Sequence, residues 1–283
     1  MKNKYIEQTM RFVFLAAACV SIAATITICI FLFANGVPAM LKIGLKNFIF
    51  GLKWKPSIDL YGIFPMIVGS ITVTLGALIL GVPLGLFTAV FLARYCPKKI
   101  YNFFESGVKL LAGIPSVVYG FFGLTVIVPA IRNTFGGNGT SILAASIVLA
   151  IMILPTIISV SESSIRAVPS LYFEGSLALG ACKERSIFLV ELKAAKSGIM
   201  AGIILGVGRA VGETMAVIMV AGNQAILPRS LVKGIRTLTA NIVLEMGYAA
   251  DLHRDALIAT SVILFIFILI INLCFSLLKE KKE

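Results

Sequence analysis

The chain has 283 residues, of which 59% are hydrophobic and 13% charged, and its mean hydropathy is +1.00. A water-soluble domain of this length needs more polar surface to cover its core, so the composition excludes an ordinary soluble protein and indicates lipid as the solvent for much of the chain. The formal net charge of +12 does not indicate nucleic-acid binding, because the Lys and Arg residues stand in short clusters between apolar blocks. In membrane proteins such clusters set the orientation.

Six apolar segments are long enough to cross the hydrocarbon core of a bilayer, which needs about 20 helical residues. We therefore predict an all-α polytopic membrane protein with six transmembrane helices, near residues 11–34, 64–93, 108–131, 141–161, 197–222 and 256–279. We expect an N-terminal helix with an external loop at 1–63, then a transmembrane core at 64–283 with a cytoplasmic loop at 162–196. A cleaved signal peptide is the alternative for the first segment, but its apolar run is too long and no A-x-A site closes it.

The distribution of Lys and Arg predicts the orientation of the chain. With the N-terminus inside, 14 of them fall in cytoplasmic segments: Lys2, Lys4, Arg11, Arg94, Lys98, Lys99, Arg166, Lys183, Arg185, Lys193, Lys196, Lys279, Lys281 and Lys282. Nine fall in external segments: Lys42, Lys46, Lys53, Lys55, Arg132, Arg229, Lys233, Arg236 and Arg254. This moderate excess favours a multi-pass membrane protein with both termini cytoplasmic.

Glycine and proline residues mark places where helices pack closely or break. In the fifth segment glycines recur at every fourth residue on two neighbouring faces: Gly198, Gly202 and Gly206, then Gly208 and Gly212. This spacing lets helix backbones approach closely in lipid. Gly81, Pro83 and Gly85 predict a local break in the second helix. These features are explained by ordinary bundle packing or, alternatively, by flexing during gating.

The polar segment at 162–196 contains two short amphipathic stretches, residues 170–179 and 183–192, which Gly180 separates. Several of its apolar side chains would be poorly solvated on a free loop: Leu177, Leu179, Ile187, Phe188 and Val190. They predict a docking face for a cytoplasmic partner.

This segment resembles the EAA loop of ABC importer permeases, whose pattern is E-A-A, three residues, Gly, nine residues and I-x-L-P. Glu174 opens the pattern here, Gly180 occupies the glycine position, and Lys193 stands in place of the proline. The resemblance implies that the loop inserts into a groove of an ATPase subunit; the alternative is an ordinary amphipathic interhelical loop. The residues that match or replace the pattern are Glu174, Gly175, Ser176, Ala178, Gly180, Val190 and Leu192.

Three further stretches resemble phosphate-specific ABC permeases. They are WKP from residue 54 with YGIFPMIVGS following, LLAGIPSVVYGFFGL at 110–124, and GRAVGETMAVIMVAGN at 208–223. The continuation TMAVIMVAGN is similar to the PstC-type member of the permease pair rather than to its PstA-type sister. A sulfate, molybdate or other-solute permease is the competing interpretation within ABC importers. A passive channel or a secondary transporter would not need the EAA-like loop.

The resemblance implies an assembly in the lipid of the bacterial cytoplasmic (inner) membrane. It consists of this chain, a homologous PstA-type phosphate permease, two copies of a PstB-type ABC ATPase and an extracellular PstS-type phosphate-binding protein. The sequence has no G-x-x-x-x-G-K-[ST] motif, so we expect ATP to be used by the partner ATPase. We expect a transporter subunit rather than an enzyme, with no cofactor bound by this chain. The lone His253 and the scattered cysteines give no metal site.

Arg209 and Glu213 lie inside the fifth predicted span, where a charge is costly unless it is paired or faces a polar cavity. Their spacing of four residues predicts an ion pair on one helix face. The pair either locks helix packing or contacts phosphate, with Arg209 binding the anion and Glu213 accepting a hydrogen bond from a protonated oxygen, or merely positioning Arg209. Further pathway candidates, for which simple packing is the alternative, are Ser116, Tyr119, Thr214 and Asn223.

Overall fold

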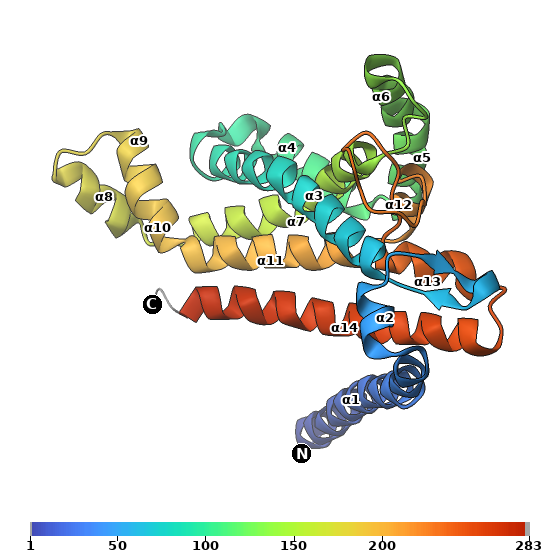
Figure 1. Ribbon diagram of the computed structural model, residues 1–283. Helices are drawn as coiled ribbons and strands as arrows, with labels where there is room; N and C mark the ends of the chain where they lie inside the picture. Colours follow the sequence, from blue (N-terminus) through green and yellow to red (C-terminus); the bar gives the residue numbers. More distant parts are fainter. Residues whose placement is uncertain (1, 281–283) are drawn as a thin grey trace.

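The computed structural model describes residues 2–280, with the backbone alone described for 2–6, 8 and 275–280. Lys281 and Lys282, which count toward the predicted orientation, lie outside the described residues. The described chain is helical apart from loops and one small hairpin (Figure 1), in which β1 (Trp54–Lys55) pairs antiparallel with β2 (Leu60–Tyr61) around the 3₁₀ turn η1 (Pro56–Ile58). The prediction of an all-α polytopic membrane protein is confirmed.

Five segments of the described chain are long and apolar enough to cross a membrane: Thr9–Ile43, Phe64–Tyr95, Ser116–Phe135, Ile142–Arg166 and Asp251–Cys274. The first two belong to α1 (Lys2–Ile43) and to α3 (Phe64–Val90) with its π-helical end η2 (Phe91–Tyr95). The third combines α5 (Ser116–Phe122), the π-helical η3 (Gly123–Ile127) and α6 (Val128–Phe135). The last two belong to α7 (Ile142–Arg166) and α14 (Asp251–Glu280).

The predicted third span at 108–131 is wrong, because these residues do not form one continuous helix. α4 (Lys98–Gly113) ends before Ile114, whose backbone is extended at φ −70° and ψ 127°. Because Pro115 has no N–H and disfavours a helical conformation in the residue before it, the chain restarts as a separate helix at Ser116. α4 has no buried residue and is not among the apolar spans.

The predicted span at 197–222 is divided in the structure. α11 (Lys196–Gly212) has 17 residues, about 25 Å of helix at 1.5 Å per residue. Glu213 and Thr214 leave the helical conformation, and α12 (Met215–Val220) adds six residues. The chain then returns through a loop, in which Gly222 bridges to Ile235, before α13 (Leu238–Met246) begins.

The centre of the bundle is a layer in which α7 lies against α3 on one side and α11 on the other. The predicted break in the second helix is wrong, because α3 continues through Pro83. Its glycines serve packing instead: a Cβ on Gly81 would lie 2.9 Å from Ile153 Cδ1, and one on Gly85 would lie 2.8 Å from Ile157 Cγ2.

The glycine spacing in α11 has two different outcomes. Gly198, Gly202 and Gly206 face α7, where an added Cβ would lie within 3.2 Å of Ser164, Val160 and Ile157 side chains. This predicted close approach is confirmed. A Cβ on Gly208 or Gly212 would meet nothing within 4 Å in the described chain, so this second face of α11 is open.

The two ends of the bundle differ in what they carry (Figure 1). At one end the hairpin and α2 (Leu45–Phe50) pack with the start of α14, around the buried residues Phe48, Ile63 and Leu257. At the other end lie α8 (Ser170–Ala178), α9 (Lys183–Ser186), the π-helical η4 (Ile187–Glu191) and α10 (Leu192–Ala194). We call residues 167–195 the α8–α10 loop; the C-terminal end of α14 lies at the same end of the molecule.

Candidate functional site

Two interrupted helices of the bundle lie side by side. α5 begins just after the break at Pro115, and α12 begins just after the break at Glu213. The helices are in close contact, because a Cβ on Gly120 would lie 2.9 Å from the Cα of Ala216. Irregular backbone at membrane depth is found where it is buried in protein or lines a polar cavity, so this region is the candidate pathway site.

The hydroxyls beside the first break have different surroundings. Tyr119 is buried, and its hydroxyl donates a hydrogen bond of 2.7 Å to the Leu111 carbonyl, which ties α5 back to the end of α4. Ser116 is half-buried, and its hydroxyl has no hydrogen-bond partner in the described chain. Of these two candidates, Ser116 has the hydroxyl that is open to a ligand.

The predicted ion pair between Arg209 and Glu213 is wrong. An i, i+4 pair needs an unbroken helix, whereas Glu213 lies beyond the end of α11 at φ −69° and ψ 129°. Its Oε1 instead accepts a hydrogen bond of 3.2 Å from the Ala216 N–H and caps α12. Glu213 is thus a local cap at the break.

The Arg209 guanidinium is half-buried and makes no hydrogen bond or ion pair within the described part of the chain. It is close enough to Tyr119 for the two side chains to interact electrostatically. Gly208 and Gly212, on either side of it in the sequence, belong to the open face of α11. The structure therefore places an unpaired cation next to the two helix breaks.

The remaining two candidates lie at opposite ends of α12. The Thr214 hydroxyl donates to the Gly212 carbonyl at 3.2 Å, so this residue belongs to the break. Asn223 lies beyond α12 at φ 53°, and its amide donates to the Ile218 carbonyl at 2.8 Å. Its Oδ1 is buried without a partner. Asn223 thus shapes the loop after α12 and is not gathered with the others.

A small polar cavity next to Glu213 was missed by the sequence analysis. It has a volume of about 10 Å³, room for about one water molecule. Its hydroxyl groups come from two distant parts of the chain: Ser70, Thr74, Thr237 and Thr239. The spacing of four between Ser70 and Thr74 in this mostly apolar helix was the available signal, since it places two hydroxyls on one face.

The α8–α10 loop contains both predicted helical stretches. Gly180, between them, has φ +86°, a conformation that disfavours any side chain and accounts for glycine here. Leu177, Leu179 and Phe188 are exposed, with Leu179 at 91%. Ile187, predicted for the same face, is instead fully buried with Ile165 and Ile199, because η4 turns it toward the bundle.

The residues that match the EAA-like pattern differ in their exposure. Glu174, Gly175 and Ala178 are exposed on α8, and the Ser176 hydroxyl bonds its own helix through the Phe173 carbonyl at 2.8 Å. Val190 and Leu192 are half-buried near the base of the loop. The part that could meet a partner is therefore α8 with Leu179 and Phe188.

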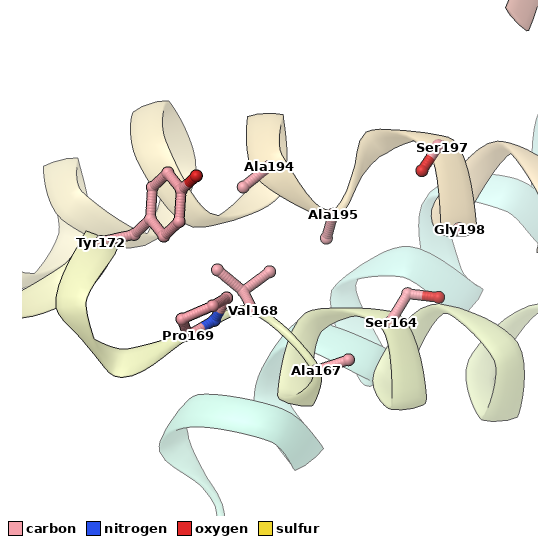
Figure 2. Close-up of a pocket in the computed structure, with 9 residues that line it drawn as sticks. All are labelled: Ser164, Ala167, Val168, Pro169, Tyr172, Ala194, Ala195, Ser197 and Gly198. Carbon is pink, nitrogen blue, oxygen red and sulfur yellow. The ribbon is translucent and has the colours of Figure 1, made fainter.

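A hollow of about 360 Å³ lies at the base of this loop. Figure 2 shows Val168, Pro169 and Tyr172 on one side of it and Ala194 and Ala195 on the other. These residues belong to the two ends of the loop, one after α7 and one before α11. The loop is therefore not packed tightly against the bundle between its two attachments.

Similarity to known sequences identifies the family of this chain. Residues 81–281 match the family described as binding-protein-dependent transport system inner membrane component. The chain is 38% identical to a probable ABC transporter permease protein, YqgH, of Bacillus subtilis, over 96% of this chain and 92% of the relative. It is 33% identical to the phosphate transport system permease protein PstC of Mesorhizobium japonicum, over 86% of this chain and 81% of the relative.

Solved structures share the fold at low sequence identity. A chain from a crystal structure of a bacterial alginate ABC transporter, in complex with a pentasaccharide-bound periplasmic protein, matches with a TM-score of 0.61 and 14% identity. The match covers 93% of this chain and 92% of that one. A chain of the inward-facing MetNI methionine ABC transporter matches with a TM-score of 0.59 and 19% identity, over 81% of this chain and 99% of that one. These likenesses show the ABC importer permease fold.

Proposed function

The chain belongs to the family of binding-protein-dependent transport system inner membrane components, and from that premise we propose that it is the permease subunit of a phosphate importer. The family makes it a multi-pass inner-membrane subunit of an ABC importer, a transporter component and not an enzyme. Such a permease works with an ATPase, a second permease and a binding protein. What we propose beyond the family is the substrate, phosphate.

The observation that carries the proposal is the unpaired Arg209 guanidinium beside the two helix breaks. A half-buried cation in a membrane span is stabilised by an anion that replaces its lost hydration. A guanidinium binds two oxygens of a tetrahedral anion at once, and the Ser116 hydroxyl can donate to a third. The N-terminus of α5, which continues helically to Phe135, adds partial positive charge at the same break.

Phosphate is favoured among the tetrahedral anions by similarity to PstC proteins and by the chemistry of Glu213. The relatives at 33% identity include phosphate transport system permeases. Near neutral pH, phosphate carries a proton that it can donate, whereas sulfate does not. Glu213, already an acceptor at the break through Oε1, would receive that proton's hydrogen bond. The alternative is that Arg209 alone binds the anion while Glu213 shapes the break.

In the proposed assembly α11 and α12 together make the sixth crossing, and the open face with Gly208 and Gly212 turns toward a PstA-type permease across the pathway. A PstB-type ATPase, which uses the ATP, docks on α8 and Leu179. A PstS-type binding protein delivers phosphate at the hairpin end. This arrangement makes the α8–α10 end cytoplasmic, together with both termini.

The anion site is tested by phosphate uptake into proteoliposomes that contain the full transporter. Arg209→Gln removes one charge-assisted contact, so we expect uptake to fall by about tenfold or more. The matched control is Arg132→Gln, because Arg132 is exposed at the far end of α6. Uptake that survives Arg209→Gln at the control level overturns the anion site.

Two further variants separate substrate choice from assembly. Glu213→Gln should lower phosphate uptake without a gain in sulfate uptake, and unchanged phosphate uptake would exclude the acceptor role.

Leu179→Asp should release the ATPase from the purified complex, because it places a charge on the most exposed apolar side chain of the loop. Leu231→Asp, at an exposed leucine outside the α8–α10 loop, is its control. An ATPase retained by Leu179→Asp counts against docking there.

A further inference from the structure

An ion pair joins the α8–α10 loop to the end of α3. Arg94 Nη2 lies 2.7 Å from Glu191 Oε1, and the Glu191 side chain is only 1% exposed. Both residues lie in π-helical segments, Arg94 in η2 and Glu191 in η4. Segments of this kind are uncommon and are found frequently at functional sites.

The same arginine also holds the end of α7. Arg94 Nη2 donates to the Ile165 carbonyl at 2.9 Å, and Arg166 Nη2 donates back to the Leu92 carbonyl at 2.8 Å. These reciprocal bonds fix the ends of α3 and α7 to each other. Arg94 is therefore the residue at which α3, α7 and the loop are joined.

Other contacts of the loop with the bundle lie at the same end of α3. Ile187 packs with Ala89, Val90 and Ile165, and the Lys183 ammonium lies 4.7 Å from the centre of the Tyr95 ring. Between the two chain connections, by contrast, lies the hollow of Figure 2. The loop therefore contacts this end of α3 through Ala89 and Val90 and, in η2, through Arg94 and Tyr95.

The ion pair leaves some of its own hydrogen-bonding atoms without partners, which is unfavourable for a purely stabilising contact. Glu191 Oε2 and Arg94 Nε are buried without a partner in the described chain. Burial raises the pKa of Glu191, although Arg94 opposes this shift. A buried pair with unsatisfied atoms is often no more stable than apolar residues of similar volume, so stability alone does not account for it.

We propose that Arg94 is the positioning residue through which displacement of the α8–α10 loop reaches α3 and α7. The inference rests on the proposed docking of an ATPase to this loop. α3 and α7 interlock at Gly81 and Gly85, and α7 in turn packs against Gly202 and Gly206 of α11. Movement that enters at Arg94 therefore continues to the helix that carries Arg209.

The experiment measures whether nucleotide still moves α11 when the ion pair is absent. A reporter cysteine replaces Gly212, where an added side chain meets nothing within 4 Å, in a background with the five native cysteines changed to alanine. The full transporter in proteoliposomes is labelled with a maleimide, without nucleotide and after trapping with ATP and vanadate. The variants are Arg94→Gln, Glu191→Gln and Arg94→Lys. The control is Lys109→Gln, which breaks an exposed ion pair with Glu105.

In the parent and the control, we expect trapping to change the labelling rate by about fivefold or more, the lower range of coupling between distant sites. In Arg94→Gln and Glu191→Gln that change should disappear while ATP hydrolysis and complex assembly persist. Arg94→Lys should restore part of it, because the ammonium can still pair with Glu191. A parent-like response in Arg94→Gln, or no response in the parent, overturns the proposal.

The two proposals fail separately. Loss of ATPase from the parent complex would refute docking, and absence of phosphate uptake by the parent would refute the substrate. The labelling response needs the docked ATPase but no phosphate, so it is read in complexes that retain the ATPase, whatever the substrate. If Arg94→Gln does not assemble, Glu191→Gln decides: assembly with a parent-like response shows that the ion pair is not the linkage and overturns the proposal.

Discussion

Two nearly buried glutamates lie at opposite ends of the bundle and are satisfied very differently. Glu245, at the hairpin end, uses both oxygens: Oε1 pairs with Arg236, and Oε2 bonds Trp54 Nε1 and His253 Nε2, each at 2.8 Å. Glu191, at the α8–α10 end, has Arg94 on one oxygen and no partner on the other. Their side chains are 8% and 1% exposed, so burial alone does not distinguish them.

The difference indicates that the hairpin end of the molecule is held by more bonds than the α8–α10 end. A buried charge with every lone pair satisfied holds its neighbours in one arrangement, since each alternative leaves a charge unpaired. Around Glu245 this fixes the hairpin to α13 and to the start of α14. Around Glu191 one carboxylate oxygen and the Arg94 Nε have no partner, so fewer bonds hold this end in its present arrangement.

The largest expected effect is that of Glu245→Ala. The change leaves the half-buried Arg236 without its carboxylate partner, and breaking a buried pair destabilises by about 3–5 kcal/mol. Trp54 is the single tryptophan of the chain, so denaturant unfolding in mild detergent, followed by its fluorescence, reports on this site directly. Glu105→Ala, in an exposed ion pair, should change the free energy of unfolding by less than about 1 kcal/mol. Equal effects of the two variants would contradict a fixed hairpin end.

Glu191→Ala should destabilise the protein less. It removes one charge-assisted contact, worth about 1.5–3 kcal/mol. Glu245→Ala removes three contacts, those with Arg236, Trp54 and His253. The same unfolding measurement checks this value. A loss as large as that of Glu245→Ala would mean that the two ends are equally fixed, and the comparison would fail.

The comparison also shows what the sequence could and could not predict. The main spans and the helical stretches around Gly180 follow from apolar length and periodicity, which are local properties. The Glu245 cluster does not, because Trp54 and Glu245 are 191 positions apart and no local pattern joins them. The same holds for Arg94 and Glu191, whose meeting depends on how the α8–α10 loop folds back.

The prediction of the candidate pathway site was wrong in the course of the backbone. A spacing of four predicts a contact between Arg209 and Glu213 only if the helix continues through Gly212, and it ends there. Likewise, an uninterrupted apolar run hid the break at Pro115, which turned a predicted span into α4 and α5. Both errors lie where two helices are interrupted side by side, which is also where the pathway is proposed.

The smallest expected effect tests the neighbouring contact at the α8–α10 end. The Tyr101 hydroxyl donates a hydrogen bond of 2.7 Å to Glu162, and this bond, with burial, raises the pKa of Tyr101 to about 12. Because the folded-state pKa lies above the ordinary value, the bond stabilises the fold fully below about pH 10 and is lost as the pH rises through 12. The difference in tyrosinate absorbance between the parent and Tyr101→Phe should therefore show a midpoint near pH 12. At neutral pH the variant should lose little stability, since Arg166 still holds Glu162 at 2.7 Å. A midpoint near the ordinary tyrosine value would mean that this contact also opens in the resting protein and that mobility at this end extends beyond Glu191.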